Sequence, residues 1–416
     1  MLPTETKDNT DSLKRALRLP CGVTISNRIA KSAMSEQLAD RYGSPTRELE
    51  QLYAAWARGG AGLLVTGNVM VDGRALVEPR NAILESDRFL GAYRLWADAA
   101  HAYNTTILMQ INHPGRVAVL PLTSRPLAPS AVTVKLPGLN LRVPRAMTEA
   151  DIHDQVRRFA TTAALAVKAG FDGVQVHAAH GYLLSQFLSP IANTRTDGWG
   201  GSPEKRRRLL LEVVRAVRGA IGPDRALSVK LNAADFQRGG FSQEESLDVA
   251  LALEHEGIDL LEISGGNYES PAQLGFAAPE QIARDAYFLA YAEELRRRTK
   301  LPRMLTGGLR DVRIMSRIVD TNIVDIIGMA RPFAVQPDIA KQLLSGEPAA
   351  ALPRVPAIGY KPIDAYLQLG WHSAQFRRIA AGHTPRSLGG FCRTVVALGP
   401  RMAMNIATQS LSGEAR

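Results

Sequence analysis

The chain contains little cysteine: only Cys21 and Cys392 occur among its 416 residues. Two cysteines so far apart exclude a disulfide framework, a zinc knuckle and the clustered set that binds an iron–sulfur centre. No stretch reaches about 18 consecutive apolar residues, so we expect no transmembrane helix and no membrane partner. Residues 1–20 also lack the apolar run of a signal peptide. These absences predict a cytoplasmic protein.

Charge of one sign is not concentrated anywhere along the chain. The formal net charge is +10, but lysine and arginine are dispersed. The two densest basic clusters, at 205–208 and 296–298, fall inside helical patterns, where such clusters are typical of a solvated face. Because no segment combines basic and aromatic residues as nucleic-acid sites do, we expect no nucleic-acid partner. We expect a small-molecule substrate instead.

The chain does contain a regular alternation of short β-branched runs and helical patterns. We expect strands at 28–34, 62–67, 105–112, 173–178, 226–232, 259–265, 303–308 and 324–330. We expect helices near 47–58, 87–103, 148–169, 203–220, 242–256, 283–299, 310–319 and 335–345, several of them with N-terminal capping residues such as Thr148, Ser202 and Ser242. Eight strand–helix units predict an α/β fold, the (β/α)8 TIM barrel.

A doubly wound sheet is the alternative architecture. Such sheets carry a glycine-rich phosphate loop after the first strand, whereas this chain has KSAMSEQLAD at residues 31–40. The sequence GGAG at 59–62 precedes a strand rather than following one, so it is not a dinucleotide-binding motif. The barrel is therefore the better interpretation.

Two segments fall outside the alternation. Residues 114–147 form a proline-rich insertion after the third strand, where long loops act as lids or binding walls. Residues 349–416 follow the barrel domain at 1–348 and show helical patterns near 361–381 and 393–409. We expect this C-terminal helical extension to pack on the barrel or on a partner subunit, which leaves a homo-oligomer open.

In a TIM barrel, function collects where strands end. His177 ends the fourth strand, and His180 and Tyr182 follow it. Zinc would need a third ligand, and no other strand end supplies one. The alternative to a metal site is a structural one, in which both histidines only make hydrogen bonds inside a loop. Glu262 is a lone acid near the sixth strand, so no carboxylate pair for glycoside hydrolysis is expected.

An organic cofactor is the third interpretation. The pyrimidine edge of flavin mononucleotide (FMN) requires an amide and a cation, which Gln110 and Lys230 would supply. Its phosphate requires backbone N–H groups and an arginine, which the ends of the last two strands would supply through Gly307, Gly308 and Arg331. Each residue is common by itself, but their joint position at strand ends favours FMN.

These residues stand in sequences that resemble the Old Yellow Enzyme family of NADH:flavin oxidoreductases, over roughly residues 15–345. The resemblance is carried by NRIAKSAMS, QINHPGR, PLAPSA, PRAMTEADI, the long run GFDGVQVHAAHGYLLSQFLSPIANTRTDGWGGSPEKR, VKLNAADF, TGGLR and GMARP, in that order. The long run at 170–206 is the most specific of these motifs.

The resemblance implies an FMN-dependent ene-reductase with NADPH or NADH as a transient hydride donor. The implied cofactor-binding residues are Ala33, Met34, Ser35, Gly67, Gln110, Lys230, Gly307, Gly308, Ala330 and Arg331. His177 and His180 match the pair that binds the substrate's carbonyl oxygen, and Tyr182 matches the catalytic proton donor. Hydride would pass from flavin N5 to an α,β-unsaturated carbonyl, and Tyr182 would protonate the other alkene carbon.

Several positions depart from the family pattern. Ser35 stands where threonine or cysteine is usual, Gln37 where some members have a substrate-contacting tyrosine, and Ala330 where a glycine is usual. Gln175 and Trp199 also differ, and we interpret both as structural, like the pair Arg195 and Asp197. Two alternative functions stay open: the same flavin barrel acting on nitro compounds or as an oxidative demethylase, and a barrel without cofactor that serves as a binding protein.

Overall fold

Parallel strands form a closed central barrel in this computed structural model, which describes residues 10–118, 123, 125–136, 139–140, 142–267, 269, 278–309, 311–347 and 361–386. The barrel strands are β3 (Ile29–Lys31), β4 (Leu63–Val65), β6 (Thr106–Asn112), β11 (Gly173–Ala178), β12 (Ala226–Asn232), β13 (Leu260–Ser264), β14 (Arg303–Thr306) and β15 (Ile326–Met329). Each pairs in parallel with its neighbour, and the β11–β6 pairing closes the ring. The (β/α)8 barrel expected from the sequence is therefore confirmed.

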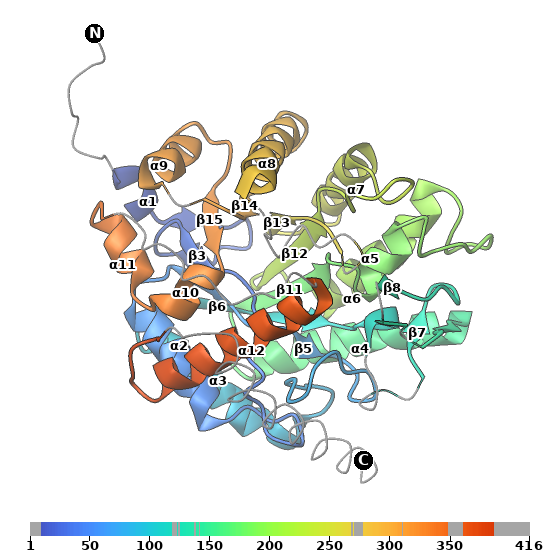
Figure 1. The fold of residues 1–416 in the computed structure, drawn as a ribbon, viewed down its shortest axis with the longest axis horizontal. Coiled ribbons are helices and arrows are strands. Elements are labelled where there is room, and N and C mark those ends of the chain that lie inside the picture. The colour runs from blue at the N-terminus through green and yellow to red at the C-terminus, as the bar shows by residue number, and fades with distance from the viewer. Residues whose placement is uncertain are drawn as a thin grey trace.

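Helices surround the ring of strands (Figure 1). They are α1 (Asp11–Lys14), α2 (Arg47–Arg58), α3 (Leu90–His101), α4 (Glu149–Lys168), α5 (Leu183–Leu188), α6 (Pro203–Ile221), α7 (Gln243–His255), α8 (Ala278–Arg298), α9 (Val312–Asp320), α10 (Arg331–Val335), α11 (Ile339–Leu344) and α12 (Lys361–Ala380). Among the described residues, no helix has both the length and the apolar content needed to cross a membrane.

The capping residues expected from the sequence begin three of these helices. Thr148 and Ser242 form capping boxes with Asp151 and Glu245, and the Ser202 hydroxyl accepts a hydrogen bond from the Lys205 amide. These side chains satisfy N–H groups that a helix leaves without partners in its first turn. The starts of α4, α6 and α7 were therefore predictable to within one residue.

The core fills both the barrel interior and the space between strands and helices. All seven residues of β6 and of β12 are buried, because one face of each strand meets the interior and the other meets a helix. A short antiparallel hairpin, β1 (Leu17–Arg18) and β2 (Thr24–Ile25), precedes the barrel. Its residue Ile25 packs in one apolar cluster with barrel residues that include Leu63, Leu260 and Met304. The hairpin therefore closes the barrel interior at the end where these strands begin.

The structure corrects the helix expected at 335–345. That segment contains the end of α10 and all of α11, separated at Gln336, whose φ of −145° and ψ of 85° are not helical. Gln336 precedes Pro337, and the proline ring disfavours helical backbone in the residue before it. The break leaves α10 as a separate short helix directly after β15.

Short elements that the sequence analysis did not anticipate lie between the barrel strands and their helices. They are β5 (Val69–Met70), β7 (Leu127–Ala128), β8 (Lys135–Leu136), β9 (Leu139–Asn140) and β10 (Arg145–Ala146), together with η1 (Asp87–Phe89) and η2 (Gly115–Val117). Strands β7 to β10 belong to the proline-rich insertion, where β7 pairs with β10 and β8 with β9. The insertion therefore has local structure of its own.

Helix α12 lies beside α10 and α2 (Figure 1). The ring of Phe376 meets Trp56 of α2 edge to face, with centroids 5.4 Å apart. Ser373 donates a hydrogen bond to the Glu36 carbonyl (3.1 Å) and Arg377 one to the Gln37 carbonyl (3.3 Å). The helix therefore braces the segment that follows β3. The helical pattern near 393–409 lies outside the described residues.

Candidate active site

The sequence-predicted site residues lie at the carboxyl ends of the barrel strands or in the segments that follow them. Ala33, Met34 and Ser35 follow β3, Gly67 follows β4, Gln110 lies on β6, and His177 lies on β11 with His180 and Tyr182 after it. Lys230 lies on β12, Gly307 and Gly308 follow β14, and Ala330 and Arg331 follow β15. Parallel strands place all these ends on one face of the barrel.

His177 contacts both His180 and Tyr182. The His177 ring meets the His180 ring at 5.1 Å and the Tyr182 ring at 4.8 Å between centroids, edge to face in both cases. A tight turn makes this possible, since His180 has a φ of 61° and Gly181 a φ of 75°. Asn232 secures the turn by accepting a hydrogen bond from the His180 amide at 3.1 Å. Ser264 lies 2.6 Å from His180 Nε2 and orients that ring.

Both histidines are held in the neutral form. Burial lowers the pKa of each well below its usual value, and the Lys230 cation lowers both further. His177 Nδ1 accepts a hydrogen bond from the Ala179 amide at 3.3 Å, so its proton is on Nε2. In the described part of the chain, no group of three or more metal-ligating side chains gathers. The geometry is that of neutral N–H donors beside a tyrosine.

A buried polar network crosses the barrel interior. Gln110 Nε2 donates to Gln175 Oε1 (2.8 Å), and Gln175 Nε2 donates to Glu262 Oε2 (2.8 Å). Lys230 Nζ lies 2.9 Å from Glu262 Oε1, and the Thr306 hydroxyl donates to the same oxygen at 2.6 Å. The network joins strands β6, β11, β12, β13 and β14 and fixes the positions of the Gln110 amide and the Lys230 cation.

Glu262 is the counter-ion of Lys230, a partnership that the sequence analysis did not assign. Its Cα pairs with that of Lys230 in the β12–β13 register, and its side chain is fully buried. The sequence did contain a signal for this partnership, because Lys230 and Glu262 occupy equivalent positions near the ends of consecutive strands. Gln175, interpreted as structural, is the link between Gln110 and Glu262.

The backbone after β3 and β4 is held by a second buried network. Glu36 accepts hydrogen bonds from the Tyr53 hydroxyl and from the Gly67 amide (2.9 Å), and Lys31 Nζ lies 3.6 Å from the same carboxylate. Burial lowers the pKa of Lys31 to about 8, although Glu36 opposes that shift. Sequence reasoning missed Glu36, which ties the segment after β3 to Gly67.

Ser35 and Gln37 both donate hydrogen bonds to the carboxylate of Glu78, which belongs to the segment between β5 and η1. The Ser35 hydroxyl was expected to reach the flavin, and here it also has a protein acceptor. Burial raises the pKa of Glu78, and nearby Glu36 raises it further. Glu78 lies 41 residues from Gln37 in sequence, and no sequence pattern indicated that the two meet.

The ends of β14 and β15 form a corner suited to a phosphate. Among the described residues, a methyl group built on Gly307 would meet one atom within 4 Å, Phe288 Cδ2 at 3.8 Å, so these residues leave the backbone there open to close approach. Arg331 begins α10; burial lowers the pKa of His372 of α12 to about 4, with a smaller contribution from the charge of Arg331. An open glycine backbone and a guanidinium fit the phosphate of FMN.

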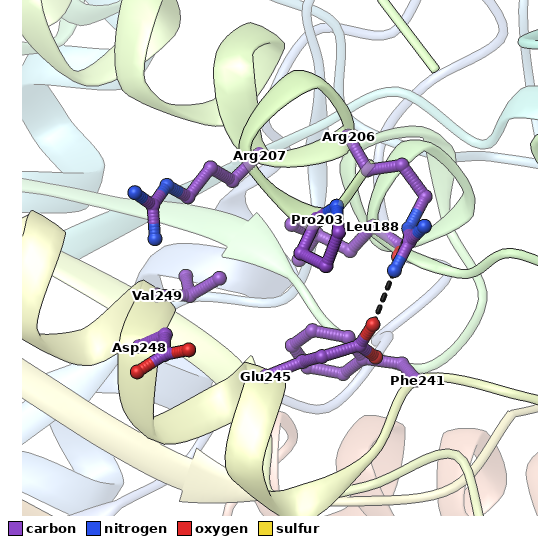
Figure 2. Close-up of a pocket in the computed structure, with 8 residues that line it drawn as sticks. All are labelled: Leu188, Pro203, Arg206, Arg207, Phe241, Glu245, Asp248 and Val249. Carbon is purple, nitrogen blue, oxygen red and sulfur yellow. Dashed lines mark hydrogen bonds and ion pairs between the residues drawn. The ribbon is translucent and has the colours of Figure 1, made fainter. Parts of the chain in front are cut away.

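Arg206 and Arg195 have structural positions. Figure 2 shows a small depression between α6 and α7, lined by Leu188, Pro203, Arg206, Arg207, Phe241, Glu245, Asp248 and Val249, in which Arg206 pairs with Glu245. None of these is a sequence-predicted site residue. Arg195 pairs with Asp197 and donates to the carbonyl oxygens of Pro129 (3.0 Å) and Met147 (2.6 Å). Arg206 therefore joins α6 to α7, and Arg195 joins its own loop to the backbone at Pro129 and Met147.

Comparison with known proteins identifies the family. Residues 20–349 match the NADH:flavin oxidoreductase / NADH oxidase family. The chain is 33% identical to the NADH-dependent flavin oxidoreductase iccE of Talaromyces variabilis over 407 residues, covering 88% of this chain and 98% of that protein. It is 37% identical to the NADH-dependent flavin oxidoreductase nadA of Aspergillus parasiticus over 354 residues, covering 80% of this chain and 79% of that protein.

Solved structures agree with this assignment. The old yellow enzyme homologue from Zymomonas mobilis is 26% identical, with a TM-score of 0.70 over 83% of this chain and 94% of that chain. Morphinone reductase is also 26% identical, with a TM-score of 0.67 over 83% of this chain and 91% of that chain. The chain therefore belongs to the NADH:flavin oxidoreductase family of Old Yellow Enzymes, as an oxidoreductase that uses FMN with NADH or NADPH as the donor.

Proposed function

We propose that this oxidoreductase reduces activated carbon–carbon double bonds, those conjugated to a carbonyl or another electron-withdrawing group. The observation that carries the proposal is the contact of neutral His177 with both a second neutral histidine, His180, and Tyr182 at the carboxyl end of β11. Two N–H donors can bind one carbonyl oxygen, and the adjacent hydroxyl can give a proton to carbon. No separate nicotinamide domain is required, because the donor and the alkene would bind in turn at the same face.

His177 and His180 would activate the substrate. Each neutral imidazole donates one N–H group, and hydrogen bonds to the carbonyl oxygen draw electron density away from the conjugated alkene. Ser264 and Asn232 hold His180 in the required orientation. Tyr182, the N-cap residue of α5, would protonate the carbon next to the carbonyl, since a phenol hydroxyl can donate its proton.

The FMN would be held by the residues that surround the barrel mouth. Gln110 and Lys230 suit the pyrimidine edge, because the network through Gln175 and Glu262 fixes both. The remaining contacts would come from Ala33, Met34, Ser35, Gly67, Gly307, Gly308, Ala330 and Arg331. Bound FMN supplies the hydride carrier between NAD(P)H and the alkene.

Anaerobic absorbance spectroscopy tests the proposal. The purified protein loaded with FMN should lose its flavin absorbance when NADH or NADPH is added and regain it when 2-cyclohexenone is added. Recovery with a nitroaromatic compound but not with the enone would contradict the proposal and favour nitro reduction. A protein that cannot be loaded with FMN would contradict both the proposal and the assigned cofactor.

A further inference from the structure

The turn at residues 77–81 places a carboxylate beside the segment that follows β3. Asn81 Oδ1 accepts hydrogen bonds from the amides of Val77 (3.2 Å) and Glu78 (2.9 Å), which makes the turn compact. Arg80 fixes the turn to the segment after β3, because its guanidinium donates to the Ala39 carbonyl at 2.7 Å and its own carbonyl accepts from the Ala39 amide at 3.3 Å. These hydrogen bonds therefore hold Glu78 in a defined position at the barrel mouth.

The turn also borders the proposed reaction pocket. Val77 belongs to one apolar cluster with Tyr182, together with Met70, Leu76, Ile83, Val117 and Val134. On its other side, Glu78 bonds to Ser35 and Gln37, which follow β3. The turn thus joins the apolar cluster that contains the proposed proton donor to the proposed flavin-binding segment, through Val77 on one side and Glu78 on the other.

Half of the Glu78 carboxylate is not used by the residues that the structure describes. Both hydrogen bonds from Ser35 and Gln37 end on Oε2, and no described residue donates to Oε1. No ion pair joins Glu78 to a described lysine, arginine or histidine, and the charged group that acts on its pKa is another acid, Glu36. Burial raises the pKa of Glu78 and Glu36 raises it further, while the hydrogen bonds from Ser35 and Gln37 oppose this rise only in part.

We propose that Glu78 is a specificity-determining residue that binds the protonated amine of a substrate through Oε1, next to the His177–His180 pair. A cation would balance the negative charge of Glu78, which a neutral hydroxyl or amide would not do. A charge-assisted hydrogen bond is also stronger than one made by a neutral donor. The inference rests on the proposed function, because it assumes that the carbonyl of the substrate is bound by the two histidines.

Ligand binding to the FMN-loaded enzyme tests this inference without turnover. The probes are 4-methylphenol, 4-(2-aminoethyl)phenol and 4-(3-aminopropyl)phenol, whose phenol oxygen takes the place of the substrate oxygen and whose amines reach different distances. Dissociation constants come from the change in flavin absorbance. In the wild-type enzyme, at least one amine should bind about tenfold more tightly than 4-methylphenol.

Glu78→Gln keeps the length of the side chain and removes its charge. This variant should bind the amines and 4-methylphenol with nearly equal affinity, while the dissociation constant of 4-methylphenol stays at the wild-type value. The matched control is Glu85→Gln, on the same segment, whose carboxylate bonds to the Gly73 amide and to no site residue. That variant should keep the preference for the amine.

Two results would overturn the inference while leaving the proposed function intact. One is equal binding of all three phenols by the wild-type enzyme, and the other is a preference for the amine that persists in Glu78→Gln. An enzyme that binds FMN but none of the phenols would contradict the histidine pair itself, and the inference about Glu78 would fail with it.

Discussion

Lys230 and Glu262 face each other on the adjacent parallel strands β12 and β13 and form a buried ion pair, with Nζ 2.9 Å from Oε1. The hydroxyl of Thr306 and the amide of Gln175 satisfy the same carboxylate. A buried cation is costly unless it is paired and hydrogen-bonded. Glu262 therefore serves as the buried counter-ion of Lys230, one of the residues proposed to hold the flavin.

Removing the charge of Glu262 should destabilise the barrel strongly. In Glu262→Gln, Lys230 loses its counter-ion, and breaking a buried pair in this way costs about 3–5 kcal/mol. Urea unfolding of the FMN-free protein measures the loss. The control is Glu212→Gln, which breaks the more exposed pair with Arg208 and should cost less than about 1 kcal/mol. Similar losses in the two variants would contradict the structural role of the Lys230–Glu262 pair.

Tyr182→Phe separates the two halves of the proposed reaction. The variant keeps the ring that contacts His177 and loses the proton donor, so oxidation of the reduced enzyme by 2-cyclohexenone should slow by about 100-fold to 10,000-fold. Reduction by NADH or NADPH should be nearly unchanged, because it needs no proton from Tyr182. Stopped-flow absorbance measures both steps. Equal slowing of both would refute the assigned role, and Tyr103→Phe, at an exposed tyrosine, should alter neither.

Gly307→Ala tests the proposed phosphate corner. Within the described part of the chain the added methyl would meet Phe288 alone, at 3.8 Å, so the fold without cofactor should keep its unfolding midpoint. The same methyl would occupy the space through which a phosphate approaches the backbone, so FMN should bind about tenfold or more weakly. Fluorescence titration with FMN measures the affinity. Gly219→Ala, where an added methyl meets nothing within 4 Å, should leave FMN affinity unchanged; if Gly307→Ala does the same, the phosphate lies elsewhere.

The barrel itself was predictable because its strands are runs of apolar, β-branched residues that are buried on both faces. The run at 226–232 coincides with β12, and the run at 173–178 coincides with β11. Because parallel strands end on one face of a barrel, the strand assignments alone predicted that His177 and Lys230 lie on the same face. This prediction needed only the apolar periodicity and the order of the strands, not the structure of the loops.

Contacts between distant loops were not predictable in the same way. Glu78 meets Ser35 and Gln37 through a turn whose sequence, Val77 to Asn81, contains no strand or helix pattern. Likewise, the helical pattern at 361–381 indicated a helix, but nothing in it indicated that Ser373 would contact the Glu36 carbonyl or that His372 would lie beside Arg331. Such contacts depend on the relative placement of segments, which local periodicity does not record.

His113 should make the stability of the protein depend on pH below neutrality. The residue follows β6, is 1% exposed, and burial lowers its pKa to about 4. Above pH of about 6.5, the ring is neutral in both the folded and the unfolded chain. As the pH falls from there towards 4, the unfolded chain takes up a proton that the folded chain does not, so the free energy of unfolding decreases.

His113→Asn isolates this contribution, because an amide oxygen can accept the Gly115 N–H bond that His113 Nδ1 now accepts at 3.1 Å. Between pH 7 and pH 5, the wild-type protein should lose about 2 kcal/mol more unfolding free energy than the variant, as measured by urea unfolding at both pH values. The other buried histidines titrate in both proteins, so their contributions cancel in the difference. His153→Asn, at an exposed position of α4, should keep the wild-type pH dependence. Equal losses in the wild type and in His113→Asn would mean that His113 is not held neutral by burial.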